Sequence, residues 1–418
     1  MIGYEVMEMI TKIENGSRVR MADAIRGLCL LGILAANMLI FQYGMYGKEE
    51  MELFGGLSGI DRAAHAFLKI AVEGSFYPIF LFLFGYSLFK LRDSLAKRGH
   101  KPWRSLVRRF LMLMGLGLLH SWLLWEGDIL LLYGAMGFIL LMFVGRKTKT
   151  LVIWGAILSV LMVAISYGAP SDSNSELFDE QHLESYVEKS IAVYGGGAYG
   201  EIMDFRMNED PMNLDPIVAA VMVVLAPLIV TPMFLFGIAA SKAGWLHNPK
   251  QERRRSGLLA LALPAGLAFK SVGVLLPDWD WSGIFLMAGS QLLAFGYIFG
   301  AAFVMSYATG HSKIVESFEA VGRMSLTNYL MQTVICTTIF YGYGLGWFGK
   351  LGVVYGIVLT LFIFFLQAAA STVILRRAKH GPIEKLLRIW TYWSLSGKAK
   401  PAKKPAAPQA NYSGPSVQ

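Results

Sequence analysis

A chain of 418 residues is long enough for two or three soluble domains, but its composition excludes that organisation. Hydrophobic residues make up 55% of the chain, charged residues only 16%, and the mean hydropathy is +0.48. A soluble core cannot use that much apolar surface, whereas a bundle of membrane-spanning helices can. The net charge of +9 does not indicate a nucleic-acid partner, because the basic residues lie in short loops between apolar runs.

Two further features of the composition concern processing and metal binding. Cys29 and Cys336 both fall in apolar runs, so we expect neither a disulfide framework nor a metal site. The first 20 residues contain Glu5, Glu8 and Glu14 and lack the pattern of a signal peptide. We therefore expect the first span to be retained as an anchor.

Ten apolar runs are long enough to cross a bilayer, which takes about 20 helical residues for about 30 Å. They cover residues 24–43, 66–89, 105–124, 128–144, 151–167, 217–240, 257–276, 283–305, 320–341 and 351–374. We therefore predict an all-α, polytopic integral membrane bundle of about ten transmembrane helices.

Basic and acidic loops alternate between these runs. Basic residues cluster before the first run and after the second, fourth, sixth and tenth, whereas the loops between them are acidic. By the positive-inside rule, both termini are predicted to be cytoplasmic in a cell (plasma) membrane. The chain then divides into an N-terminal five-helix half (1–168), an acidic extracytoplasmic loop (169–213), a C-terminal five-helix half (214–396) and a disordered cytoplasmic tail (397–418).

The second and sixth runs share a local pattern. A proline, Pro78 or Pro232, is followed two residues later by Phe-Leu-Phe and then by a glycine, Gly85 or Gly237. A repeat of parallel halves would explain this pattern, and so would chance in helices rich in Phe and Leu.

The stretch 115–137 places two ionisable residues at a turn between apolar runs. His120 lies about one and a half turns before the turn, and Asp128 opens the following run. An ionisable residue in a membrane segment indicates a functional site by default, and histidine suits proton transfer near neutral pH. The alternatives are a histidine bonded to a backbone carbonyl and an aspartate that caps a helix. We expect His120 and Asp128 to share a polar cavity with Asn37 and Glu73.

Asn37 and Glu73 lie in the same outer half of the predicted bundle. Asn37 is near the end of the first run, where it either bonds a neighbouring helix or belongs to the site. Glu73 precedes Pro78 by five residues and is either a member of an ion pair or a site residue. His65, just outside the second run, is either solvated or an alternative active histidine.

A second set of polar residues lies at the predicted inner face. Asp23 and Arg26 share one helix face at i and i+3, so they form either a structural ion pair or part of a ligand site. Arg323 lies at the inner end of the ninth run. Asn328 and Gln332 follow it on one face, where they either bond neighbouring helices or line a pocket.

Five ordered motifs resemble the YeiB-like membrane family, whose C-terminal half is catalogued as a domain of unknown function numbered 418. They are RGLCLLGILAANM, FYPIFLFLFGYSLF, LHSWLLWEGDILLLYG, GRMSLTNYLMQ and GPIEKLLR, and the resemblance extends over residues 18–393. The family is grouped distantly with transmembrane acyltransferases, including acyltransferase-3 proteins and heparan-alpha-glucosaminide N-acetyltransferase. Those enzymes move an acyl group from cytoplasmic acyl-CoA to an extracytoplasmic acceptor.

The resemblance suggests roles for single positions. Acyltransferase-3 proteins carry a histidine where this chain has Asn37, and the heparan enzyme carries Asn there. The position nearest to the heparan enzyme's active histidine is His65, whereas His120 is the motif histidine of the YeiB-like pattern. The acyltransferase hypothesis makes His120, or His65, a general base oriented by Asp128 or Glu73, with Asn37 as an oxyanion donor. The predicted donor-binding residues are Asp23, Arg26, Arg323 and Asn328.

Three classes of function remain open from the sequence. The first is an acyltransferase that uses acyl-CoA and no metal, with a small-molecule, glycan or lipid-linked acceptor. The second is a transporter or flippase for a small anionic or lipid-linked substrate, in which the same residues form a proton-coupled site. The third is a sensor or scaffold protein without chemistry. The lipid bilayer is the expected partner in each case.

Overall fold

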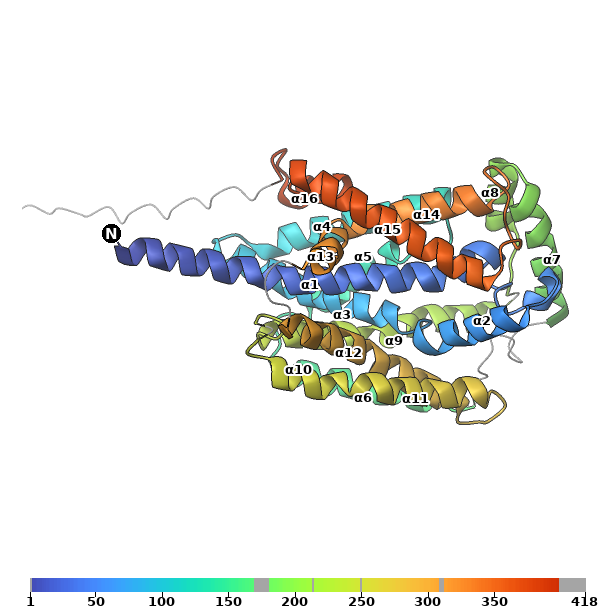
Figure 1. The fold of residues 1–418 in the computed structure, drawn as a ribbon, viewed down its shortest axis with the longest axis horizontal. Coiled ribbons are helices and arrows are strands. Elements are labelled where there is room, and N and C mark those ends of the chain that lie inside the picture. Colours follow the sequence, from blue (N-terminus) through green and yellow to red (C-terminus); the bar gives the residue numbers. More distant parts are fainter. Residues whose placement is uncertain (1, 169–179, 213, 249, 308–311, 398–418) are drawn as a thin grey trace, which may run out of the picture.

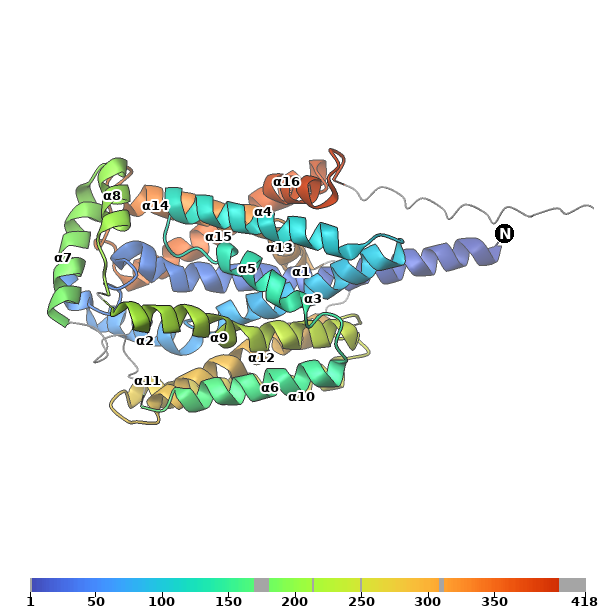
Figure 2. The ribbon, with the colours of Figure 1, turned by 180° about the vertical axis from the view of Figure 1, so that it is seen from behind.

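The computed structural model describes residues 2–168, 180–212, 214–248, 250–307 and 312–397 (Figure 1). Within these ranges every regular element is helical, with α-helices α1 to α16 and one short 3-10 helix at Met51–Phe54. Most of the long helices lie side by side along the long axis of the molecule (Figures 1 and 2). The predicted all-α membrane bundle is confirmed.

Eight helical segments of the described chain are long and apolar enough to cross a membrane. They correspond to the expected spans other than the fourth and the ninth. They are α1 (Ile2–Tyr43, apolar over Arg20–Tyr43), α2 with α3 (Gly59–Ala71 and Phe76–Lys97), α4 (Pro102–Leu123), α6 (Thr148–Ile165), α9 (Pro216–Lys242), α10 with α11 (Arg253–Ala260 and Ala262–Leu275), α12 (Ser282–Tyr307) and α15 (Val353–Arg377).

The fourth and ninth expected spans are shorter helices. The run 128–144 forms α5 (Leu130–Leu141), and the run 320–341 is interrupted at Met324 between α13 (Lys313–Arg323) and α14 (Ser325–Phe340). At 1.5 Å per residue, α5 and α14 are about 18 and 24 Å long, less than the roughly 30 Å of the hydrocarbon layer. Both helices border the candidate site described below.

The remaining helices lie at the two ends of the bundle. The described part of the acidic loop forms α7 (Glu180–Gly196) and α8 (Tyr199–Asn208), at the end opposite to the N-terminus (Figures 1 and 2). Helix α16 (Pro382–Tyr392) lies towards the end at which α1 enters (Figure 1). Residues 169–179 and all but Gly397 of the predicted disordered tail are outside the described residues.

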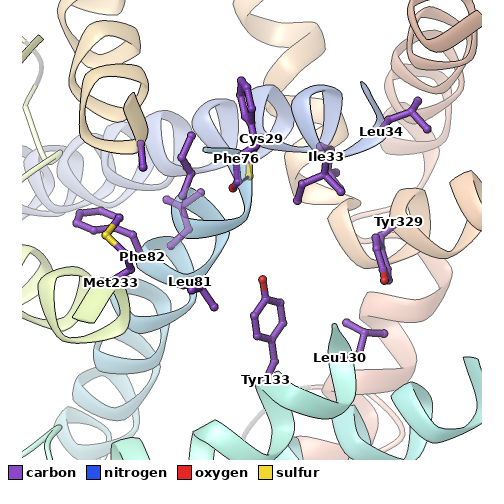
Figure 3. Packing of buried hydrophobic residues seen from close by; sticks show 14 of the residues in the cluster. Cys29, Ile33, Leu34, Phe76, Leu81, Phe82, Leu130, Tyr133, Met233 and Tyr329 are labelled. Carbon is purple, nitrogen blue, oxygen red and sulfur yellow. Dashed lines mark hydrogen bonds between the residues drawn. The ribbon is translucent and has the colours of Figure 1, made fainter. Parts of the chain in front are cut away.

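Helix α1 runs through the interior and contacts α3, α12, α13, α14 and α15. Its buried face includes Cys29 and Leu34, which are drawn in Figure 3 with their neighbours. The thiol of Cys29 donates a hydrogen bond of 3.1 Å to the backbone carbonyl of Phe76, at the start of α3. This contact fixes the start of α3 against the middle of α1.

Helices α3 and α9, which carry the shared proline–Phe-Leu-Phe–glycine pattern, pack directly against each other. A Cβ on Gly85 would lie 2.2 Å from the carbonyl oxygen of Phe234, and one on Gly237 would lie 1.9 Å from that of Phe82. Phe82 and Met233 lie beside each other at this crossing (Figure 3). The two glycines therefore allow the backbones to touch, as small residues do between membrane helices.

The close contact between α3 and α9 predicts that two glycine substitutions will differ in their effect on stability. Gly237→Ala pushes a methyl group into the backbone of α3, and we expect it to lower the free energy of unfolding by about 1–3 kcal/mol. Gly115→Ala is the control, because a Cβ at this α4 position meets nothing within 4 Å. Thermal unfolding in detergent measures both, and equal midpoints for the two variants would contradict the role of the crossing.

Candidate functional site

The turn between α4 and α5 brings His120 and Asp128 together. Helix α4 closes where the backbone carbonyl of His120 accepts the N–H groups of Leu124 and Trp125, at 2.9 and 3.0 Å. Gly117 lets α5 approach, since a Cβ there would lie 2.2 Å from the backbone nitrogen of Leu131. The two apolar runs on either side of the predicted turn therefore form a tight helical hairpin.

His120 is held between two side chains from different helices. Its Nδ1 lies 2.8 Å from Oδ1 of Asp128, and its Nε2 lies 3.0 Å from Oγ1 of Thr333 on α14. The side chains of His120 and Asp128 are only 1% and 2% exposed. The structure thus places hydroxyl, imidazole and carboxylate in one buried line, which is the arrangement that activates a hydroxyl group.

The hydrogen bonds also indicate which tautomer a neutral imidazole adopts at this position. A carboxylate accepts only, so Nδ1 of His120 donates to Asp128 and Nε2 of the neutral ring accepts from the Thr333 hydroxyl. The other carboxylate oxygen of Asp128 accepts the backbone N–H of Leu131 at 2.8 Å, in the first turn of α5. Asp128 therefore orients the histidine and caps a helix at the same time.

Helix α8 holds the hairpin from outside the bundle. Arg206 donates to the backbone carbonyl of Ser121 and, at 3.2 and 3.1 Å, to those of Trp122 and Leu124. Its Nε also lies 3.2 Å from Oε2 of Glu126 in the turn. These bonds satisfy carbonyl groups that the end of α4 leaves free. Nothing in the sequence distinguishes Arg206 from other loop cations, so this role was not predicted.

A cavity of about 420 Å³ lies towards the end of the bundle at which α1 enters. It brings together Asp23, Arg26 and Arg323, three of the four residues that we predicted to bind an anionic donor. Further ionisable residues from α4, α16 and the segment before α16 line it, namely Arg109, Lys379, His380, Glu384 and Arg388.

Both carboxylates of this cavity are engaged within the protein. Asp23 lies 2.5 Å from Nη1 of Arg26, as the i, i+3 spacing predicted, and Nη2 of Arg26 donates to Ser87 at 2.9 Å. Glu384 accepts the backbone N–H groups of Leu326 and Thr327, at 2.7 and 3.0 Å, and so caps α14. Cations therefore outnumber free carboxylates around the cavity, which suits an anionic ligand.

The end of the same cavity that lies between α3, α5 and α14 is apolar and aromatic. Its walls include Phe80 and Phe84 of α3 and Leu130 of α5, together with Tyr133 and Tyr329. The hydroxyl groups of the two tyrosines are buried, and neither donates a hydrogen bond to a described residue (Figure 3). Buried hydroxyl groups normally have a partner, so these two are candidate donors to a ligand.

His120 adjoins this apolar end without lining it. The ring of Tyr329 separates them, with its centroid 5.3 Å from that of His120. Tyr329 and Thr333 are i and i+4 on α14, so one face of this helix carries both of the α14 side chains that His120 contacts. The basic residues, the apolar chamber and the histidine therefore follow one another along the bundle.

Asn328, the fourth residue predicted to bind the donor, lies outside this cavity lining. Its amide nitrogen donates to the Val321 carbonyl at 3.2 Å and to the Ser371 hydroxyl at 3.0 Å. Gln332 likewise donates to Gln367 of α15 at 3.0 Å. These bonds join α13, α14 and α15, so the structure favours the helix-bonding alternative for both amides.

Asn37 and Glu73 are not in one cavity with His120 and Asp128, and that prediction is corrected. Asn37 lines a small cavity of about 80 Å³ beside Gly127, and its amide has no hydrogen-bond partner in the described part of the chain. Glu73 lines a separate cavity of about 640 Å³ and is paired with Lys48. The hairpin packs tightly around His120, so no common space is left between the four side chains.

His65 lies half-buried in α2, on the side of Glu49 and Lys69. His120, by contrast, has a carboxylate on one ring nitrogen and a hydroxyl on the other. An oriented base needs such a partner, so the geometry favours His120 over His65 as the active histidine.

Because His120 and Asp128 are buried together, we expect the loss of Asp128 to destabilise the protein more than the loss of an exposed capping aspartate. Asp128→Ala leaves Nδ1 of His120 and the N–H of Leu131 unpaired in the interior, and we expect it to cost about 2–4 kcal/mol. Asp215→Ala is the control, because Asp215 caps α9 in the same way but is exposed, and its loss should cost about 1 kcal/mol. Thermal unfolding compares them, and equal losses would mean that Asp128 is a cap and nothing more.

Comparisons with known proteins match the chain over most of its length. A family model described as "Protein of unknown function (DUF418)" matches residues 240–394. The chain is 33% identical over 414 residues to "Uncharacterized protein YxaH" of Bacillus subtilis (strain 168), covering 93% of this chain and 98% of that protein. It is 30% identical over 380 residues to "Uncharacterized protein YeiB" of Escherichia coli (strain K12), covering 88% and 94%.

Proposed function

The chain belongs to the YeiB-like, DUF418 family of membrane proteins, and we propose that it is an integral-membrane acyltransferase. In this proposal it moves an acyl group from cytoplasmic acyl-CoA to an extracytoplasmic glycan or lipid-linked acceptor. The family that the five motifs suggested is confirmed by these matches. The acyl-transfer reaction is the proposal, and the geometry around His120 supports it.

The cavity beside α1 is the proposed donor site. Arg26, Arg109 and Arg323 would contact the phosphates of CoA, because guanidinium groups bind phosphate in a bidentate manner. The acyl chain would occupy the aromatic chamber between α3 and α5. One observation carries the proposal. The cationic lining, the apolar chamber and the oriented histidine lie next to one another, in that order, in one part of the bundle.

The proposed chemistry uses His120 as the general base. An acceptor hydroxyl or amine would take the place of the Thr333 hydroxyl at Nε2 and give its proton to the ring. The acceptor atom then bonds to the thioester carbon, the C–S bond breaks, and the CoA thiolate leaves with the proton from His120. Asp128 stabilises the imidazolium, and the hydroxyls of Tyr133 and Tyr329 donate to the oxyanion.

Two substitutions separate donor binding from catalysis. Arg26→Gln removes a charge-assisted contact worth about 1.5–3 kcal/mol and should weaken acyl-CoA binding roughly ten- to a hundredfold. His120→Ala should leave that affinity unchanged and lower the transfer rate by about 10²–10⁴. Calorimetric titration with acyl-CoA and a thiol-release assay measure the two effects on purified protein.

Arg62→Gln is the matched control for the charge, since Arg62 is exposed and lies outside the cavity. If acyl-CoA binds the Arg26→Gln variant as tightly as the unaltered protein, Arg26 serves only its ion pair with Asp23. If His120→Ala transfers acyl groups at the original rate, the assignment of the base is wrong.

A transporter or flippase is the second candidate, favoured by one observation. The 420 and 640 Å³ cavities lie towards opposite ends of the bundle, and each has charged residues in its lining. Alternating access needs such a pair of openings. Acyl-CoA would then fail to bind, and proton-coupled uptake into vesicles would depend on His120.

The proposed localisation is the plasma membrane, with both termini in the cytoplasm. The alternation of basic and acidic loops supports it. We expect a membrane-impermeant maleimide to label Ser185→Cys of α7 on intact cells, whereas Ser396→Cys becomes labelled only after lysis. Both serines are exposed, and the native Cys29 and Cys336 are buried and should stay unlabelled. Labelling of Ser396→Cys on intact cells would reverse the orientation.

A further inference from the structure

The second cavity, of about 640 Å³, is charged in one part and apolar elsewhere. It lies between α2, α3, α9, α11 and α12, towards the end of the bundle opposite to the N-terminus (Figure 1). Lys48, Glu49, Lys69, Glu73 and Lys270 form its charged part. No residue of the proposed acyl-CoA site belongs to its lining.

Four of these five charges are paired with one another. Nζ of Lys48 lies 2.6 Å from Glu49 and also contacts Glu73, and Nζ of Lys69 lies 2.8 Å from Glu49. Burial opposes ionisation of Glu49, but the charges and hydrogen bonds of Lys48 and Lys69 lower the pKa of that carboxyl to about 2. Glu49 therefore stays ionised, and the two carboxylates are paired with Lys48 and Lys69.

Lys270 is the remaining charge. Its residue is 3% exposed, and its ammonium donates to the backbone carbonyl of Glu73. Among the described residues Lys270 forms no ion pair, and the carboxylate of the nearby Glu73 is bonded to Lys48 instead. An ammonium group has three donors, and a buried charge in a membrane helix is costly without a counter-charge. Lys270 therefore presents, in the cavity lining, a buried amine that forms no ion pair with a described residue.

The position of Lys270 is built into the helix packing. Gly289 of α12 lies against its stem, and a Cβ there would be 2.6 Å from Cγ of Lys270. Lys270 lies five residues before the end of α11, about 7–8 Å along the helix. Packing against α12 therefore holds the ammonium below the helix end, where it cannot extend freely into water.

The rest of the lining is apolar. Val230 and Met233 of α9, Val274 of α11, and Leu286 and Met287 of α12 form much of the wall. A free inorganic anion would leave these surfaces without contact, and a neutral lipid would leave Lys270 without a counter-charge. A molecule with an anionic group and a hydrocarbon chain satisfies both parts.

We propose that this cavity binds an anionic amphiphile, with its phosphate or carboxylate group on Lys270 and its chain against α9 and α12. The anion completes the charge balance that Glu49 and Glu73 leave open. The proposal goes beyond acyl transfer and stands whether or not the first cavity binds acyl-CoA.

Native mass spectrometry of the full chain in a nonionic detergent tests the proposal with dodecyl phosphate as the probe. The unaltered protein should retain one such molecule that depends on Lys270. Lys270→Met should weaken this binding roughly ten- to a hundredfold, whereas Lys270→Arg keeps the charge and should retain it. Met287→Trp keeps Lys270 but fills the cavity, and it should weaken binding to a similar degree.

Control ligands and variants separate the alternatives. Inorganic phosphate should bind at least tenfold more weakly than dodecyl phosphate, and dodecyltrimethylammonium should not bind at the Lys270-dependent site. Binding that is lost in Arg26→Gln but kept in Lys270→Met would place the amphiphile in the first cavity and overturn the proposal. Equal binding by all variants, or by the cationic amphiphile, would also overturn it. Thermal unfolding of each variant confirms that it is folded.

Discussion

A polar side chain inside a membrane bundle must find its partner within the protein, because lipid offers none. His120 is held between Asp128 and Thr333, and the amide of Asn328 joins α14 to its neighbours. These bonds fix α5 and α14, two helices too short for the bilayer alone to position. Buried hydrogen bonds therefore decide where the short helices lie, and with them the aromatic end of the first cavity.

The sequence was sufficient for the fold class and for eight of the spans, because an apolar run of about 20 residues has few alternatives. It was not sufficient for the lengths of α5 and α14. The run 128–144 has the same composition whether its helix stops at Leu141 or continues, and only contacts with other helices decide. The shared pattern around Pro78 and Pro232 now has a local physical reason, since the two helices that carry it meet at Gly85 and Gly237.

In the candidate site, predictability fell with distance along the chain. The pairs Asp23–Arg26 and His120–Asp128 are three and eight residues apart, and helix periodicity or a tight turn brings each together. Thr333 is 213 residues from His120, and a threonine in an apolar run carries no signal of its own. The expected cavity around Asn37 and Glu73 failed for the same reason, because shared polarity and depth do not specify which helices are neighbours.

The two large cavities are separated by the small one that Asn37 lines. Its lining shares Ile129 with the first cavity, and Tyr77 and Gly74 with the second. At about 80 Å³ it has room for a few water molecules but not for an acyl chain. A group that passes between the large cavities through the small one meets Tyr77 and Ile129 beside the amide of Asn37. Such a barrier keeps the two ends of the bundle apart at rest, which both an acyltransferase and a transporter need in order not to leak ions across the membrane.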